Sequence, residues 1–296
     1  MSREAHPALP EFDYIKPQSL SEASNFLAEH AGEARPLLGG TDIFVRMRDG
    51  AFKEKYLVDI KGLDGTDEIT FDPKKGLIIG AAVCMNRVSD FEAVKQHYPL
   101  LAEACNSVAS YQLRNRATVV GNLCNASPAG DTIGACLLYD GVLNVHGTDR
   151  VRQEHLSTFF KGPGISTLKP GDVVTSLQLP PPPKGFVGKY LKLNRNNRGD
   201  LAIVGVTAAA YPDKDAPSGL TVKVVLASVA PTPLVVSEVE VFFQKEKLTD
   251  ASVVEAARIV MDACSPIDDV RGTARYRVMM VRNLTQKALT ALQAGL

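Results

Sequence analysis

The sequence predicts an α+β fold built in two parts, and three observations carry that prediction. Short β-type runs alternate with helical segments over residues 1–179. Four consecutive prolines follow at 180–183, where a sheet ladder cannot continue. Residues 184–296 then show three longer strands and two helices, a pattern typical of helices on one face of an antiparallel sheet. We therefore predict one domain at 1–179 and a second at 184–296.

Within residues 1–179 the predicted strands are short and separated by turn residues. The clearest pair forms a hairpin, because Pro73-Lys-Lys-Gly76 places proline early and glycine late in the connecting turn. The predicted strands of this part are 35–38, 56–60, 69–72, 77–81, 118–123, 142–146 and 173–179.

The first predicted helix has the strongest start signal. Ser19-Leu-Ser-Glu22 is a capping box, and apolar residues at helical spacing follow it. The segment 43–48 (IFVRMR) is ambiguous, because it alternates like a strand but also follows Thr41 and Asp42, which can open a helix. The predicted helices of this part are 20–30, 88–95, 100–109 and 129–139.

Beyond the prolines the predicted elements are longer. The predicted strands are 186–193, 201–211 and 220–229, and the predicted helices are 251–264 and 273–292. Asp250 precedes the first of these helices and is suited to its N-terminus.

The charge balance excludes some partners. Lysine and arginine number 33, and so do aspartate and glutamate, so the net charge is zero. Nucleic acid is therefore not predicted as a partner, because phosphate binding needs a basic surplus. Zero net charge instead favours association with other subunits. No membrane span and no signal peptide are recognisable, which predicts a cytoplasmic protein unless a partner carries it out of the cell.

The usual catalytic and metal-binding motifs are missing from the sequence. The five cysteines show no C-x-x-C pair, which favours reduced, buried thiols over disulfides or an iron–sulfur site. The histidines are scattered, so no metal site is predicted. Rossmann, Walker, H-E-x-x-H and G-x-S-x-G motifs are absent. We therefore predict no catalytic base or nucleophile on this chain.

Two glycine-containing turns carry the chemical signal. Residues 36–42 read PLLGGTD, and residues 118–131 read TVVGNLCNASPAGD. Successive N–H groups in such turns form anion-binding concavities, and glycine allows close approach. Two such turns that meet in space would hold a diphosphate. Taken alone, each also fits an ordinary polar loop in which Asp42 or Asp131 caps the next helix.

Together the two turns resemble the FAD-binding medium subunit of the molybdenum hydroxylases, the xanthine dehydrogenase and carbon monoxide dehydrogenase family. That family's motifs read A-G-G-T-D-L and R-N-x-A/G-T-I-G-G-N-L-x-x-A-S-P-A-x-D, and this chain has LGGTDI and RNRATVVGNLCNASPAGD. Val120 stands where the family has the first glycine of its second pair, so its side chain must turn away from a ligand. Further similar segments, in the family's order, are 57–60, 79–81, 189–200, 229–231 and 269–277.

The resemblance implies a fold and a set of cofactor contacts. The fold is a PCMH-type FAD-binding domain of two α+β subdomains, about 1–61 and 62–179, followed by a C-terminal domain with a three-stranded antiparallel sheet. The diphosphate would lie between the two turns, Asp131 would hold a hydroxyl of the cofactor, and Lys192 would lie near the isoalloxazine. The implied FAD-binding residues are Leu37, Leu38, Gly39, Gly40, Thr41, Asp42, Ile43, Ala109, Thr118, Val119, Val120, Gly121, Asn122, Asp131, Leu177, Tyr190 and Lys192.

The resemblance also implies an electron-transfer role. FAD on this chain would take electrons from two [2Fe–2S] clusters of a small subunit and pass them to a terminal acceptor. A large subunit would carry the molybdopterin-type molybdenum cofactor, in a dimer of heterotrimers. Two alternatives stay open, a stand-alone FAD-dependent diaphorase or reductase and a flavin-free assembly subunit. The organic substrate, the partner's metal and the acceptor (NAD, oxygen, quinone or ferredoxin) also stay open.

Overall fold

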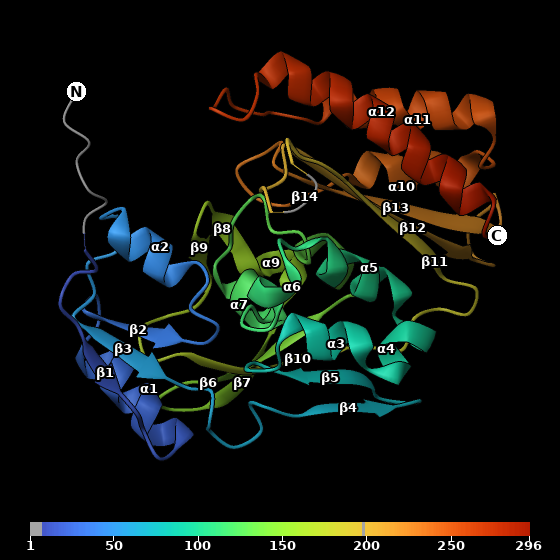
Figure 1. The fold of residues 1–296 in the computed structure, drawn as a ribbon. Helices are drawn as coiled ribbons and strands as arrows, with labels where there is room; N and C mark the ends of the chain where they lie inside the picture. The colour runs from blue at the N-terminus through green and yellow to red at the C-terminus, as the bar shows by residue number, and fades with distance from the viewer. Residues whose placement is uncertain (1–7, 197–198) are drawn as a thin grey trace, which may run out of the picture.

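The computed structural model describes residues 8–196 and 199–296, and Figure 1 shows its arrangement. Residues 1–7, part of the segment analysed for a signal peptide, lie outside the described residues. So do residues 197 and 198, within the family-like segment 189–200. Mixed helices and sheets make up the whole, as the predicted α+β class requires.

A three-stranded parallel sheet, ordered β1-β3-β2, forms the N-terminal layer. Its strands are β1 (Asp13–Ile15), β2 (Ala34–Leu37) and β3 (Tyr56–Asp59). Helices α1 (Leu20–Glu29) and α2 (Ile43–Arg48) lie on opposite faces, because Val58 packs with α1 residues whereas the neighbouring Leu57 packs with α2 residues. Successive residues of a strand face opposite ways, so the central strand β3 is buried on both sides.

The N-termini of α1 and α2 differ in detail from the capping predicted from the sequence. Ser19 caps α1 by accepting from the Glu22 N–H at 3.1 Å, but the Glu22 carboxylate accepts from the Gln18 N–H and not from Ser19. The ambiguous segment 43–48 is helical. Asp42 stands at its N-cap position without a capping hydrogen bond from its side chain, so that side chain is free for other partners.

A five-stranded antiparallel sheet, ordered β4-β5-β10-β6-β7, forms the second layer. Its strands are β4 (Ile69–Asp72), β5 (Gly76–Gly80), β10 (Val173–Leu179), β6 (Val142–His146) and β7 (Val151–His155). Short helices bury an apolar core against it. They are α3 (Met85–Asp90), α4 (Glu92–His97), α5 (Pro99–Ser107), α6 (Tyr111–Arg114), α7 (Val119–Cys124), α8 (Ile133–Leu138) and α9 (Leu156–Phe159). A small hairpin of β8 (Phe160–Gly162) and β9 (Ile165–Ser166) follows α9.

Three predictions for this part are wrong. Residues 118–123 form helix α7 and not a strand, because the Thr118 side chain accepts from the Gly121 N–H at 2.9 Å and caps a helix. The single helix predicted at 88–95 is two helices, since Phe91 is extended (ψ 126°). The helix predicted at 129–139 begins only at Ile133, because a turn comes first, in which the Gly130 N–H donates to the Ser127 carbonyl.

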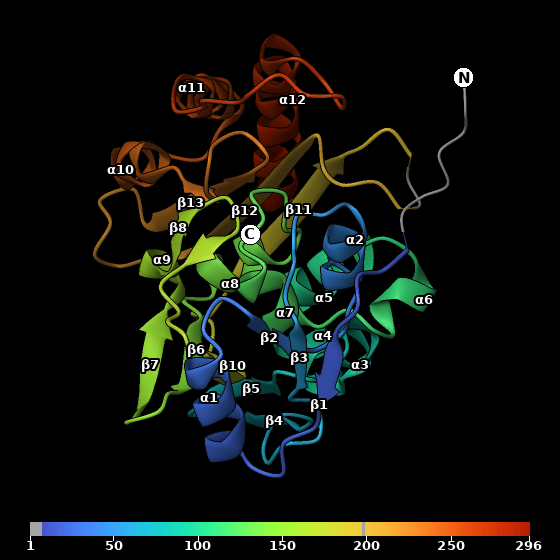
Figure 2. The ribbon, with the colours of Figure 1, turned by 90° about the vertical axis from the view of Figure 1, so that its left-hand side faces the viewer.

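A four-stranded antiparallel sheet, ordered β11-β12-β13-β14, carries the C-terminal part. Its strands are β11 (Val187–Leu193), β12 (Val204–Pro212), β13 (Leu220–Ala227) and β14 (Leu234–Val235). Helices α10 (Ser237–Lys245), α11 (Asp250–Asp262) and α12 (Ala274–Gln293) cover one face around their own core, as Figure 2 shows. The predicted helices on one face are confirmed, whereas β14 and α10 were missed because β14 has two residues and the valines of α10 alternate like a strand.

The Arg152–Asp172 ion pair predicts an acid-sensitive contribution to stability. The Arg152 guanidinium donates to both Asp172 carboxylate oxygens, at 2.7 and 2.5 Å. Burial alone would raise the pKa of Asp172, but these bonds and the Lys169 N–H outweigh it and hold the pKa below its usual 3.8. A depressed pKa stabilises the folded state above about pH 4, and this contribution is lost as the pH falls through the folded-state pKa.

We expect Asp172→Asn to lower the free energy of unfolding by about 2 kcal/mol at pH 7. The difference from wild type should shrink below about pH 4, because the wild type then loses the same contribution. Urea unfolding at pH 7, 5 and 3 measures this, with the exposed neighbour Asp149→Asn as control. A difference that stays constant from pH 7 to pH 3 would contradict the linkage.

Among the described residues, no helix combines the length and apolar character needed to cross a bilayer.

Candidate functional site

The two glycine turns meet in space, as the sequence analysis expects. A Cβ added at Gly39 would lie 2.1 Å from the carbonyl oxygen of Arg116, so only glycine allows this close approach. The Asn125 side-chain amide, from the second turn, donates to the Asp42 carboxylate at 3.1 Å. Arg46 of α2 donates to the same Asn125 side chain at 3.4 Å. The N-terminal layer is thereby joined to the loop around α7.

The first turn connects β2 to α2 and leaves backbone donors available. Gly40 has φ +76°, the left-handed region that glycine adopts without strain. Within the described part of the chain, no acceptor binds the backbone N–H groups of Gly39, Gly40 or Thr41. The flanking Leu37 and Ile43 are buried in a small apolar cluster that fixes the turn from behind. The turn therefore has a fixed conformation and unpaired backbone amides, which suits the binding of an anion.

The second turn presents the first residues of α7. Val119 and Val120 occupy its first positions, where helix geometry supplies no intrahelical acceptor for the N–H groups. Both side chains are fully buried in the main core, so Val120 points away from the turn as its departure from the family pattern requires. The side chain of Leu38 lies 3.8 Å from the position of a Cβ at Gly121. The two motifs therefore face each other.

The side chain of Arg114, upstream of the second turn, forms its hydrogen bonds within the protein. The Arg114 guanidinium donates to the Asn86 side chain and to the carbonyls of Val108 and Ala109. Arg114 therefore braces the loop that holds Ala109 at φ +41°, an unusual conformation for a residue with a Cβ.

Asp131, Tyr190 and Lys192 form a buried cluster. The Tyr190 hydroxyl donates to one Asp131 carboxylate oxygen at 2.6 Å, and the Lys192 ammonium donates to the other at 2.8 Å. Lys192 also donates to the Ser107 carbonyl at 3.3 Å. Burial raises the pKa of Asp131 while Lys192 opposes that rise, and burial beside Asp131 raises the pKa of Tyr190 well above its usual value. Asp131 therefore links the loop before α8 to strand β11, and it does not cap a helix.

Some partners of the site were missed by sequence reasoning. Glu103 of α5 pairs with Lys189 and accepts from the Tyr190 N–H at 3.0 Å, and so fixes β11 against α5. The Asn122 side chain accepts from the Thr132 hydroxyl at 2.7 Å, which ties α7 to α8. Glu103 lies 86 residues from Lys189, so no spacing rule indicates the pair. Leu177, predicted as a contact residue, is fully buried in the middle of β10.

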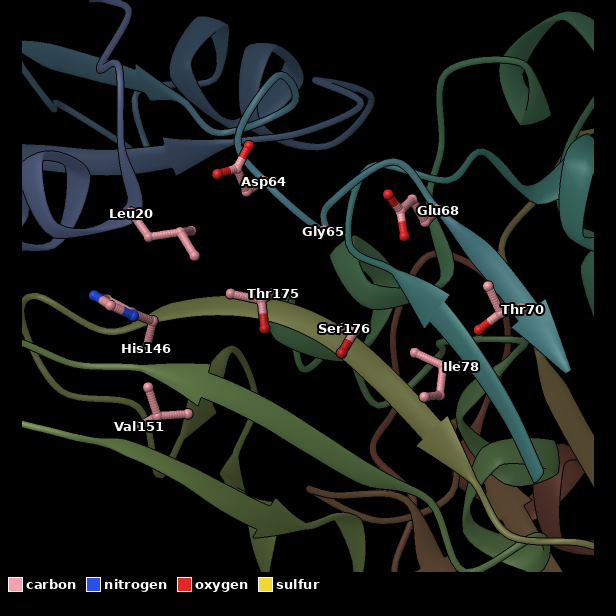
Figure 3. Close-up of a pocket in the computed structure, with 10 residues that line it drawn as sticks. All are labelled: Leu20, Asp64, Gly65, Glu68, Thr70, Ile78, His146, Val151, Thr175 and Ser176. Atoms are coloured by element: carbon pink, nitrogen blue, oxygen red, sulfur yellow. The ribbon is translucent and has the colours of Figure 1, made fainter. Parts of the chain in front are cut away.

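A separate surface pocket of about 340 Å³ contains none of the predicted site residues. It lies on the face of the five-stranded sheet that includes Ile78 and Ser176, and Figure 3 shows the side chains around it. It is lined by Leu20, Asp64, Gly65, Glu68, Thr70, Ile78, His146, Val151, Thr175 and Ser176. Among the described residues, no group of three or more His, Cys, Asp or Glu side chains is placed to hold a metal ion.

Comparison with known families identifies the class of protein. Residues 10–182 match the family model described as "FAD binding domain in molybdopterin dehydrogenase". Residues 189–292 match "CO dehydrogenase flavoprotein C-terminal domain". Fold and sequence together define an FAD-binding oxidoreductase component. The chain belongs to the family of FAD-binding medium subunits of the molybdenum hydroxylases.

Individual relatives cover nearly the whole chain. The xanthine dehydrogenase FAD-binding subunit of Escherichia coli O157:H7 is 27% identical over 95% of this chain and 96% of its own length. The glyceraldehyde dehydrogenase medium chain of Sulfolobus acidocaldarius is 29% identical over 94% and 97%.

Solved structures agree with this assignment. A carbon monoxide dehydrogenase from Hydrogenophaga pseudoflava superposes with a TM-score of 0.91 at 27% identity, covering 97% of this chain and 99% of that one. Quinoline 2-oxidoreductase from Pseudomonas putida 86 has a TM-score of 0.88 at 22% identity, covering 97% and 99%, and so shares the fold.

Proposed function

We propose that the two turns hold the diphosphate of FAD. The observation that carries this is the set of unpaired backbone N–H groups of Gly39, Gly40 and Thr41, opposite the first turn of α7. Backbone donors converging from two loops suit a doubly charged diphosphate. Leu37–Ile43 in the first motif and Thr118–Asn122 in the second are the proposed cradle. Its buried side chains supply rigidity. The hydrogen bonds come from the amides that have no acceptor in the described chain, because the Gly121 and Asn122 N–H groups already donate to Thr118.

The remaining residues of the proposed site lie around the Asp131 cluster. Asp131 accepts two protein hydrogen bonds, yet a carboxylate has further lone pairs, so it retains capacity for a cofactor hydroxyl. Ala109 would offer its backbone, and Lys192 would lie near the isoalloxazine. Tyr190 and Leu177 are buried in the main core, and we assign them the packing that shapes the proposed site.

We infer two domains, 1–179 and 184–296, with the first divided at about residue 61. Support comes from the prolines at 180–183, which separate the five-stranded sheet from the four-stranded one. The proposed site then lies between the domains, because Asp131 precedes the prolines and Lys192 follows them.

The proposed activity is electron transfer within a multi-subunit molybdenum hydroxylase. Bound FAD supplies a centre that accepts and releases electrons singly or in pairs. This chain contributes binding, orientation and a fixed electrostatic environment. Relatives named "medium chain" of carbon monoxide and glyceraldehyde dehydrogenases support a place between a large and a small subunit. From the family resemblance we propose that the large subunit carries molybdopterin, that the small one carries two [2Fe–2S] clusters, and that the complex is a dimer of heterotrimers. Five free cysteines support a reducing, cytoplasmic location.

FAD content tests the proposed cradle. We expect Gly40→Val and Gly121→Val each to lower the FAD bound per chain by about tenfold. Gly40 needs φ +76°, and a Cβ at Gly121 would lie 2.8 Å from the Thr118 hydroxyl that caps α7. Flavin released by heat denaturation and measured by fluorescence gives the stoichiometry. Full flavin content in both folded variants would show that the diphosphate is placed wrongly.

A further inference from the structure

The Asp131–Lys192 pair joins the two matched family regions inside the protein. Asp131 belongs to the FAD-binding region and Lys192 to the C-terminal region. The Lys192 ammonium lies 2.8 Å from the Asp131 carboxylate, and the two side chains are only 8% and 7% exposed. Water therefore screens this pair poorly, so its charges act strongly on neighbouring groups.

The cluster of Asp131, Tyr190 and Lys192 has no net charge, and both Asp131 carboxylate oxygens have a hydrogen-bond donor. Each Asp131 carboxylate oxygen accepts one bond, from the Tyr190 hydroxyl and from Lys192. The Ser107 carbonyl accepts a further bond from Lys192. Ser107 ends α5, two residues before Ala109 of the proposed site. One carboxylate and one ammonium thus form a neutral unit fixed at the edge of that site.

We propose that Asp131 cancels the charge of Lys192 and thereby holds the reduction potential of the bound flavin below the value that Lys192 alone would set. This inference rests on the proposed function, in which Lys192 lies near the isoalloxazine. An unpaired ammonium favours the reduced, anionic flavin, whereas a neutral pair favours it much less. Tyr190 acts through Asp131, because its hydrogen bond keeps the carboxylate turned towards Lys192.

The test is the midpoint potential of FAD in the intact complex, measured by spectroelectrochemical titration. We expect Asp131→Asn to raise the ratio of reduced to oxidised flavin at a fixed potential by about tenfold, a shift of about 30 mV for two electrons. Lys192→Gln should lower the ratio by a similar factor in a titration at alkaline pH. Alkaline pH is needed because Lys192 no longer opposes the burial that raises the pKa of Asp131, and the carboxylate must stay ionised. The double variant should return close to wild type, because its site is again neutral.

A matched control comes from the same strand. Lys189→Gln removes the same charge from β11, but Lys189 is 37% exposed and pairs with Glu103, so the potential should not move. If Asp131→Asn loses FAD, the test depends on Lys192→Gln alone. A midpoint potential below that of wild type then supports the proposal, and an unchanged midpoint potential overturns it. Loss of FAD from both single variants would also overturn it, because the pair would then be a binding element. Wild type without FAD would instead refute the proposed function.

Discussion

Gly39→Val is expected to remove bound FAD almost completely, by tenfold or more. A Cβ at this position would lie 2.1 Å from the Arg116 carbonyl oxygen and 3.1 Å from the Ala117 Cα. Both atoms are backbone, so a rotamer change cannot relieve the overlap, and the two turns have to separate. Separation moves the unpaired amides of the first turn away from α7 and dismantles the proposed diphosphate cradle.

The matched control is Gly62→Val. A Cβ at Gly62 meets no atom within 4 Å, so the same substitution is accommodated there and FAD content should equal that of wild type. Circular dichroism identifies variants that remain folded, and flavin fluorescence after denaturation gives the stoichiometry. A folded Gly39→Val protein with one FAD per chain would show that contact between the turns is unnecessary for binding.

Arg277→Met is expected to destabilise the C-terminal part by about 3–5 kcal/mol. Arg277 is 1% exposed, and its guanidinium donates to the carbonyls of Ile203 and Ser228 and to the Asp269 carboxylate. Methionine fills much of the volume but leaves all three acceptors without this donor. Burial alone would raise the pKa of Asp269, yet the Arg271 and Arg277 bonds hold it well below its usual range, so this carboxylate stays charged.

Urea unfolding of the purified chain at pH 7 measures the loss. Arg275→Met, two residues earlier on the exposed side of α12, should change the free energy of unfolding by less than about 0.5 kcal/mol. Equal stabilities of the two variants would contradict the structural role assigned to Arg277. The result also bears on the family-like segment 269–277, whose last residue, Arg277, bonds to the residue before β12 and to the residue after β13.

Local signals were enough to predict much of the fold. The capping residue Ser19, the Pro73–Gly76 turn and the four prolines each act over a few residues, and the elements around them appear as expected. The error at 118–123 is also local in origin. Thr118-Val-Val has strong β propensity, but the Thr118 hydroxyl caps a helix whose valines are buried in the main core. Tertiary burial outweighs propensity here.

The site was only partly predictable for a different reason. The two glycine turns were recognisable, because anion binding requires particular small residues within each. Their contact depends on the Arg116 backbone, and the Asp131–Lys192 pair spans 61 residues, so neither follows from spacing. Glycine is required at position 39 because the two turns pack against each other there. The sequence alone does not distinguish this requirement from a close approach of the backbone to a phosphate.

The most direct measurement is native purification of this chain from its source, with mass spectrometry of the partners and assay of bound FAD. We expect one FAD per chain, together with a large molybdopterin-binding subunit and a small two-cluster iron–sulfur subunit in equal amounts. A yellow protein without partners would support a stand-alone flavin enzyme and contradict the electron-transfer subunit. A colourless protein would contradict the flavin site itself.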